Sequence, residues 1–187
     1  GFFFQLYVPI RKMRICQSCF SDISPTDEQC PNVNTPIWKI FKNNFEKILE
    51  RWDISTQPIN QTNVGDIAIA LGWTHSYQET KILDFVDTTL RFGVLVPSGE
   101  QKNPDLLFSL PFGYDGHTAA IIDGTLAFGA YEWLSLGTYF DVLVFGSKTK
   151  CMRLKTGLHQ SGIIKLAKSE ASVEKGPLWQ VGAYIKA

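Results

Sequence analysis

Four cysteines are the residues of this sequence whose type first suggests chemistry: Cys16, Cys19, Cys30 and Cys151. The pair Cys16-x-x-Cys19 has a spacing that occurs in redox and zinc motifs. However, the sequence contains no second Cys-x-x-Cys, and no histidine stands at ligand spacing from the pair. We therefore expect no metal site and no cofactor, and we expect the cysteines to form disulfides or to remain free thiols.

Motifs of the common enzyme classes are absent from the sequence. There is no Gly-x-Ser-x-Gly nucleophile motif and no glycine-rich phosphate loop. The three histidines, His75, His117 and His159, fall at or near predicted strand ends or in loops. We expect that the protein is not an enzyme and that it has no catalytic residue.

Charged residues inside the alternating segments form the more informative group. All of them share one face, which we call the polar face: Asp66, Asp87, Arg91, Asp123 and Asp141. Charges that line a watery passage can set a preference for ions or solutes. The alternative is a polar network that only fills a narrow barrel, and the sequence leaves both interpretations open.

The elements that must position these residues are β-strands. From residue 66 to residue 76, Ile67, Ile69, Leu71 and Trp73 alternate with small or polar residues, which is the period of a strand with one apolar face. The same alternation recurs five times. It predicts six antiparallel strands, each beside the next in sequence, near 2–8, 65–77, 83–97, 117–131, 134–147 and 177–186.

Strand length and loop pattern favour a membrane barrel over a soluble sheet. Four of the alternating runs last about 11–13 residues, longer than strands of soluble proteins and long enough to span a bilayer at a tilt. Connections alternate between long and short, and most lysines and glutamates lie in them. The fold class we predict is all-β, an antiparallel up-and-down transmembrane β-barrel. A soluble antiparallel β-sandwich that binds a ligand is the alternative.

Six strands are too few to close a barrel of the smallest known type, which has about eight. The chain begins and ends inside predicted strands, so we expect a partial barrel, truncated at both ends, that forms a single domain over residues 1–187.

The first long loop, residues 11–64, interrupts the β pattern with an amphipathic helix predicted at 36–52. Thr35 can cap it and Pro36 can open it. Its apolar positions repeat at helical spacing: Ile37, Phe41, Phe45, Ile48 and Trp52. We expect Phe41, Phe45 and Ile48 to face the same way. The helix could narrow the pore or lie at the membrane interface. We favour a loop helix packed on the barrel rim.

Composition excludes two other classes. The 18 basic and 18 acidic residues give a formal net charge of zero, which argues against a general nucleic-acid-binding protein. The longest apolar stretch, residues 124–140, contains Glu132 and many small polar residues, so it does not predict a transmembrane helix.

Two short motifs are similar to those of a known group of proteins. Val64-Gly65-Asp66-Ile67 opens one predicted strand, and the stretch from Arg91 to Gly99, RFGVLVPSG, closes the next. Over about residues 64–145 the chain resembles bacterial outer-membrane barrels, nearest the transporters of the phenol-degradation meta-pathway type. The resemblance implies an outer-membrane location and the passage of small molecules, and it carries over no catalytic residue.

The function we expect is that of a passive channel or uptake porin for small solutes in a bacterial outer membrane, with the lipid bilayer as its partner. A barrel that does not conduct, and instead binds a partner or serves structure, is the alternative. The sequence specifies neither the solute nor the oligomeric state.

One pairing can be predicted residue by residue. If Tyr131 to Trp133 form a three-residue turn, Ala130 pairs with Leu134, and further along the two strands Asp123 lies directly opposite Asp141. Two facing carboxylates repel each other, so a cation must lie near them. We expect Arg91 to lie within reach of at least one, on the concave face of the sheet.

Overall fold

A computed structural model describes residues 1–15, 36, 40, 43–78, 83–131, 133–157 and 165–186 of the chain. Its centre is one antiparallel sheet of six strands, with the order β1-β4-β5-β6-β7-β10. The strands of this sheet are β1 (Phe2–Tyr7), β4 (Ile67–Gln78), β5 (Phe85–Val96), β6 (Ala119–Ala130), β7 (Leu134–Phe145) and β10 (Leu178–Lys186). Their order and antiparallel pairing confirm the prediction, and no strand end differs from its predicted position by more than two residues.

Alternation along each strand, combined with the pairing register, gives the sheet two different faces. Leu71, Phe92 and Ile122 are directly opposed on neighbouring strands, and so are Gly72, Arg91 and Asp123. Directly opposed residues point to the same side of a sheet. The apolar face is therefore the side of Leu71 and Phe92, and the polar face is the side of Arg91 and Asp123.

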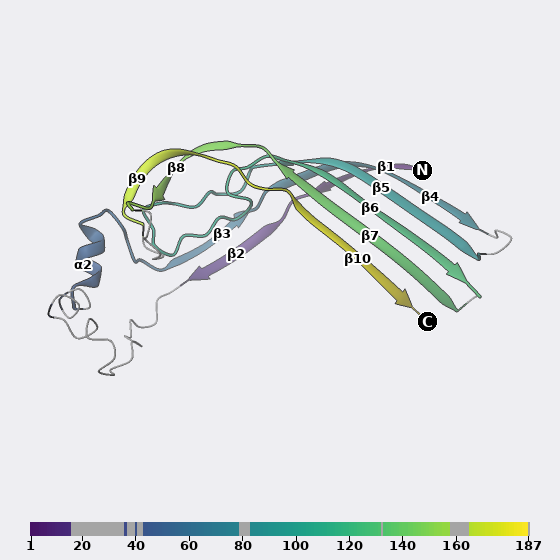
Figure 1. Ribbon diagram of the computed structural model, residues 1–187, viewed down its shortest axis with the longest axis horizontal. Coiled ribbons are helices and arrows are strands. Elements are labelled where there is room, and N and C mark those ends of the chain that lie inside the picture. The colour runs from purple at the N-terminus through teal and green to yellow at the C-terminus, as the bar shows by residue number, and fades with distance from the viewer. Residues whose placement is uncertain are drawn as a thin grey trace.

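The connections confirm the predicted alternation of short and long. Residues 79–84 and 131–133 connect β4 to β5 and β6 to β7 at one end of the sheet, on the right in Figure 1. The three long connections gather at the opposite end, which we call the loop end. At the short turn, Tyr131 has a positive φ of 58°, and Ala130 pairs with Leu134. The predicted three-residue turn is thus confirmed.

Four further strands, which the sequence analysis assigned to loops, form two ribbons at the loop end. Strands β2 (Ile10–Ile15) and β3 (Ile59–Val64) form one ribbon, and β8 (Lys148–Leu154) and β9 (Ala167–Val173) form the other. Each ribbon continues a hairpin of the main sheet beyond a bend. Alternation did not reveal them because lysines, arginines and other polar residues fall on both faces, as in Arg11, Lys12 and Arg14 of β2.

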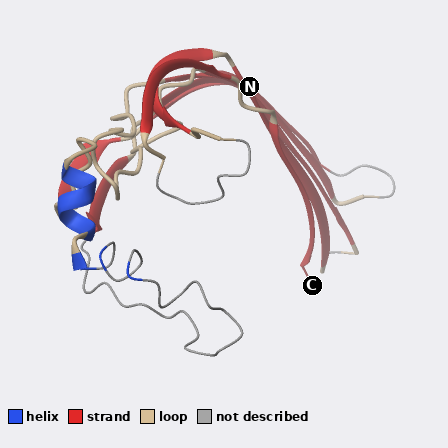
Figure 2. Ribbon diagram, turned by 60° about the vertical axis from the view of Figure 1, so that its left-hand side comes forward, coloured by secondary structure: helices blue, strands red, loops and turns tan. Residues whose placement is uncertain are grey.

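The sheet is curved, and the connection between β5 and β6 lies inside the curve (Figure 2). From that connection, Tyr114 packs against a buried cluster of Leu95, Ala119 and Leu143 on the polar face. The ring of Phe145 lies 5.1 Å from that of Tyr114, centroid to centroid. The polar face is therefore the concave face of the sheet, and its loop end is closed by packed side chains.

One helix is described in the first long connection, α2 (Phe45–Glu50), and Pro36, Ile40 and Asn43 are helical as well. Phe45 and Leu49 are buried with Ile54, against Leu107 and Leu166 of other connections. The prediction of a helix is confirmed at the described helical positions, and its buried side chains are Phe45 and Leu49. That Phe41, Phe45 and Ile48 share one face stays a prediction. Leu49 follows Phe45 by one turn and is buried, whereas Ile48 is half-buried. Phe41 lies outside the described residues.

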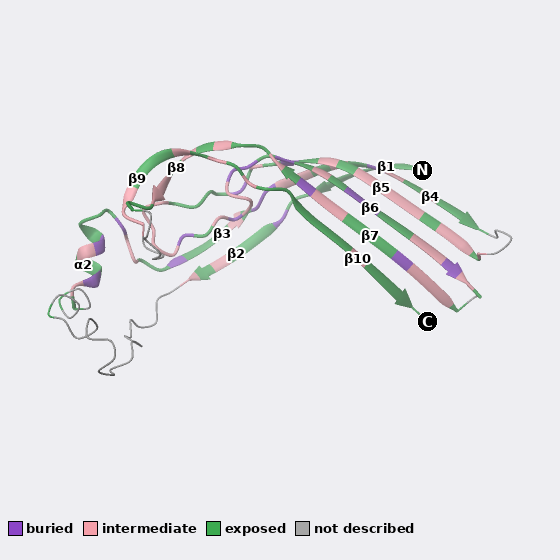
Figure 3. Cartoon of the chain, viewed as in Figure 1, coloured by how far each residue is buried: buried purple, intermediate pink, exposed green. Residues whose placement is uncertain are grey.

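The apolar face is mostly open to solvent. Phe92 is 58% exposed and Val181 68%, and the exposed colour runs along much of β10 in Figure 3. Within the described part of the chain, β1 and β10 each have only one neighbour in the sheet, so the sheet is open. No second sheet packs on the apolar face within those residues.

Candidate functional site

A row of polar side chains crosses the middle of the concave face from the first strand to the last: Gln5, Arg91, Asp123, Asp141 and Gln180. These residues come from five different strands. Alternation places each of them on the polar face, and the register places them at a similar height along the strands. We take this polar row as the candidate functional site.

Arg91 connects two members of the row. Its Nε donates a hydrogen bond to Asp123 Oδ1 at 2.6 Å, and its Nη1 donates to Gln5 Oε1 at 2.9 Å. The Arg91 side chain is 36% exposed, while that of Asp123 is 12% exposed. The guanidinium thus ties β1, β5 and β6 together and neutralises the more buried of the two central carboxylates.

Asp123 lies directly opposite Asp141, as the turn length predicted. Arg91 reaches Asp123, so that prediction is also confirmed. Asp141 is half-buried, and its carboxylate makes no hydrogen bond or ion pair with any residue that the structure describes. Its neighbour in the row, Gln180, donates from Nε2 to the hydroxyl of Tyr139 at 3.3 Å. Asp141 therefore offers a carboxylate that remains available to a solute or a cation.

The other two acidic residues of the predicted set lie apart from this row. Asp87 is exposed on the polar face, nearer the short turns, opposite Ala127. Asp66 is only 4% exposed, at the loop end. Its Oδ1 accepts a hydrogen bond from the backbone N–H of Gly99 at 3.0 Å, and its Oδ2 accepts one from the N–H of Tyr114. Asp66 thus anchors the connection between β5 and β6 to the sheet.

Aromatic rings shape the rest of the polar face, and the sequence analysis did not identify them. Four rings each lie over a glycine directly opposite on the next strand: Phe3 over Gly72, Phe85 over Gly129, Tyr139 over Gly182 and Tyr184 over Gly137. A Cβ added at any of these glycines would meet the ring. The rings therefore lie along the sheet instead of projecting from it, which keeps the concave face shallow. The sequence shows aromatic residues and glycines in these strands, but their pairing depends on registers that are set across long connections and not by a short turn.

Among the described residues, the candidates for metal or redox chemistry do not come together in one group. His75 lies on the apolar face, with its ring 5.7 Å from that of Trp73 and 4.1 Å from that of Tyr77. His117 is fully buried, its Nδ1 lies 2.9 Å from the carbonyl of Gly146, and its Nε2 has no partner. Cys151 is an exposed free thiol. Cys16, Cys19, Cys30 and His159 lie outside the described residues.

No three His, Cys, Asp or Glu side chains of the described residues gather in a group that could hold a metal ion. None of the helices in the described part of the chain has the length and apolar character that crossing a membrane requires.

Comparison of the chain with protein families, curated proteins and solved structures found no match. The resemblance to outer-membrane transporters therefore stays a prediction.

Proposed function

We propose that this chain forms part of the wall of a bacterial outer-membrane β-barrel through which small solutes pass passively. One observation supports the proposal above all others. The apolar face carries no charged side chain at any described position of the six strands, although much of it is exposed. Every charged residue of those strands lies on the polar face: Asp87, Arg91, Asp123, Asp141 and Lys186.

Large exposed apolar surfaces are costly in water, at roughly 25 cal/mol for each Å². A soluble protein rarely leaves such a face uncovered. A lipid bilayer removes the cost, and it selects against charge on the face that contacts the acyl chains. The same selection does not act on the concave face, where water can surround Asp141 and Arg91. The difference between the two faces therefore suits a barrel wall.

Strand length and the position of the aromatic residues also support the proposal. Each of β4 to β7 has 12 residues. At about 3.4 Å per residue and a tilt of about 40°, such a strand rises about 29 Å from its first residue to its last, close to the roughly 25 Å apolar band of outer-membrane barrels. Tyr77, Tyr131 and Trp133 are exposed at the short-turn end, where an interfacial aromatic girdle is expected. The barrel that we propose contains more strands than these six, because the smallest have about eight.

The charges of the polar row suggest which solutes the passage would favour. Arg91 neutralises Asp123, so the unpaired Asp141 gives the middle of the row a net negative charge. A carboxylate beside a watery passage attracts cations and repels anions. We therefore propose a weak preference for cations over anions of similar size.

Conductance across a planar bilayer tests the proposal. The full-length protein should insert and give discrete conductance steps, and its reversal potential in a KCl gradient should indicate cation preference. Asp141→Asn should reduce that preference, whereas Glu50→Gln, which removes the same charge from the exposed end of α2, should leave it unchanged. Insertion without conductance would instead support the alternative of a barrel that serves structure or binds a partner.

A further inference from the structure

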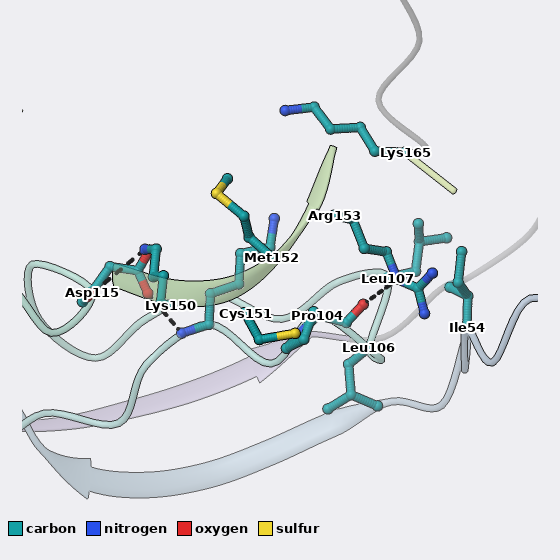
Figure 4. A pocket seen from close by; sticks show the side chains of 11 residues that line it. Ile54, Pro104, Leu106, Leu107, Asp115, Lys150, Cys151, Met152, Arg153 and Lys165 are labelled. Atoms are coloured by element: carbon teal, nitrogen blue, oxygen red, sulfur yellow. Dashed lines mark hydrogen bonds and ion pairs between the residues drawn. The ribbon is translucent and has the colours of Figure 1, made fainter. Parts of the chain in front are cut away.

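A pocket of about 130 Å³ lies at the loop end, away from the polar row. It opens between strand β8 and the connection that joins β5 to β6, as Figure 4 shows. One liquid water occupies about 30 Å³, so the pocket has space for an organic molecule of a few carbon atoms. It is therefore large enough to be a binding site instead of a gap that holds one water.

Basic side chains dominate the charge of this pocket. Of the described residues that line it, one is acidic, Asp115, and four are basic: Lys102, Lys150, Arg153 and Lys165. At neutral pH these five side chains carry a net charge of +3, from four positive groups and one negative group. Such a concentration of positive charge in a concave site attracts anions.

Two of the four basic residues are already occupied by partners within the protein. Lys150 forms an ion pair with Asp115. Arg153 donates to the carbonyls of Pro104 at 2.6 Å, Leu166 at 3.0 Å and Asp53 at 2.9 Å, and it also pairs with Asp105. Figure 4 shows the Lys150–Asp115 and Arg153–Pro104 interactions as dashed lines. Through these interactions, Lys150 and Arg153 hold strand β8 against the connections that form the other walls of the pocket.

Asp115 stays ionised in this arrangement. Burial of its carboxyl raises the pKa, but hydrogen bonds from Lys150 and from the backbone N–H of Lys102, together with the nearby positive charges, outweigh burial and lower the pKa below its ordinary value of 3.8. Asp115 can therefore neutralise Lys150 at neutral pH, but it leaves the other lysines unbalanced.

Lys102 and Lys165 are the other two basic residues of the pocket. Neither ammonium group makes a hydrogen bond or an ion pair with any residue in the described part of the chain. Part of the pocket wall is apolar and is formed by Ile54, Leu106 and Leu107. A ligand that fits both parts has an anionic group and a short apolar body.

We propose that this pocket binds a small carboxylate with an aliphatic body, with the carboxylate at Lys102 and Lys165 and the body against Leu106 and Leu107. The pocket lies outside the six-stranded sheet, so the proposal does not depend on whether that sheet crosses a membrane. An inorganic anion would leave the apolar wall without a partner, and an aliphatic alcohol would leave the lysines without one.

The two methionines of the sequence provide a direct test, because Met152 lines the pocket and Met13 lies in β2, outside it. We would label the methionine methyl groups with ¹³C in the full-length protein and titrate it with pentanoate, pentan-1-ol, pentylammonium or sulfate. Pentanoate should shift the Met152 signal to saturation and leave Met13 unchanged. The other three should bind at least about tenfold more weakly.

Variants then assign the anion-binding residues. Lys102→Gln and Lys165→Gln should each weaken pentanoate binding about tenfold, because each removes one charge-assisted contact to the carboxylate. Lys12→Gln, at an exposed position of β2, is the matched control and should not change the affinity. The Met13 signal shows in each variant whether the chain is folded. Unchanged pentanoate affinity in both pocket variants, equal binding of pentan-1-ol, or equal shifts of Met13 and Met152 would overturn the proposal.

Discussion

Replacing Arg91 with glutamine should reverse the sign of the stability change caused by Asp123→Asn. In the wild-type protein, Asp123 is held by Arg91 at 2.6 Å and faces Asp141 directly. Removing the Asp123 charge therefore loses its attraction to Arg91 and relieves its repulsion from Asp141. Without the arginine, only the repulsion remains to be relieved.

The magnitudes follow from the geometry. Opposite unit charges about 4 Å apart attract by about 4 kcal/mol at an effective dielectric constant of about 20. We reduce this to about 2 kcal/mol because the Arg91 side chain is 36% exposed and water screens it. Directly opposed residues lie about 5 Å apart, where two carboxylates repel by about 1 kcal/mol in a watery environment. Asp123→Asn should thus destabilise the wild-type protein by about 1 kcal/mol and stabilise Arg91→Gln by about 1 kcal/mol.

Urea unfolding of the four proteins, followed by tryptophan fluorescence in one detergent or lipid, measures this double-mutant cycle. The wild type, both single variants and the double variant need the same buffer, because salt screens exposed charges. If Asp123→Asn destabilises both backgrounds equally, Arg91 does not act on Asp123 through its charge, and the electrostatic account of the polar row is wrong.

Three further predictions concern other parts of the molecule. Ile122→Lys on the apolar face should destabilise the lipid-inserted protein by about 2–4 kcal/mol, whereas Thr125→Lys on the polar face should cost less than about 1 kcal/mol, both measured by urea unfolding from liposomes. Gly182→Ala should lower stability by about 1–2 kcal/mol because the new methyl group displaces the ring of Tyr139, while Gly176→Ala, with nothing within 4 Å, should be neutral or slightly stabilising. The lowered pKa of Asp115 means that its contribution to stability is present above its ordinary pKa of 3.8 and is lost as the pH falls through the lower folded-state pKa. The unfolding midpoints of the wild type and Asp115→Asn should accordingly differ at neutral pH and converge below a pH of about 3.8, whereas a constant difference would exclude the Lys150 pair as its cause.

The main sheet could be predicted from the sequence because two strong local signals agree. Alternation fixes which face each residue takes, and the three-residue turn at Tyr131 fixes how β6 meets β7. Together they placed Asp123 opposite Asp141 without any knowledge of the three-dimensional structure. The positions of Phe3 over Gly72 and Tyr139 over Gly182 could not be predicted in the same way, because long connections join β1 to β4 and β7 to β10 and no short turn fixes their register.

Features of the loop end could not be predicted in this way, because they depend on contacts between distant segments. The alternation pattern places Asp66 on the polar face just as it places Asp123. In the structure, however, the Asp66 carboxylate accepts hydrogen bonds from the backbone N–H groups of Gly99 and Tyr114, which belong to the connection between β5 and β6. The pocket combines Ile54 with residues of the β5–β6 connection and of β8. In α2, Ile48 and Leu49 follow Phe45 by three and four residues, so helical spacing allows either of them to share its buried face. Only the packing against Leu107 decides that Leu49 is the buried one.

Position-by-position lipid contact along β6 tests the central proposal most directly. A single fluorescent label would be attached in turn at residues 120 to 127, through introduced cysteines in a protein that lacks its native ones, after reconstitution into bilayers. Brominated lipids should quench labels at Ala120, Ile122, Gly124 and Leu126, and aqueous iodide should quench those at Ile121, Asp123, Thr125 and Ala127. Quenching by lipid that does not alternate along the strand, or quenching by iodide at every position, would contradict the assignment of the apolar face to the membrane.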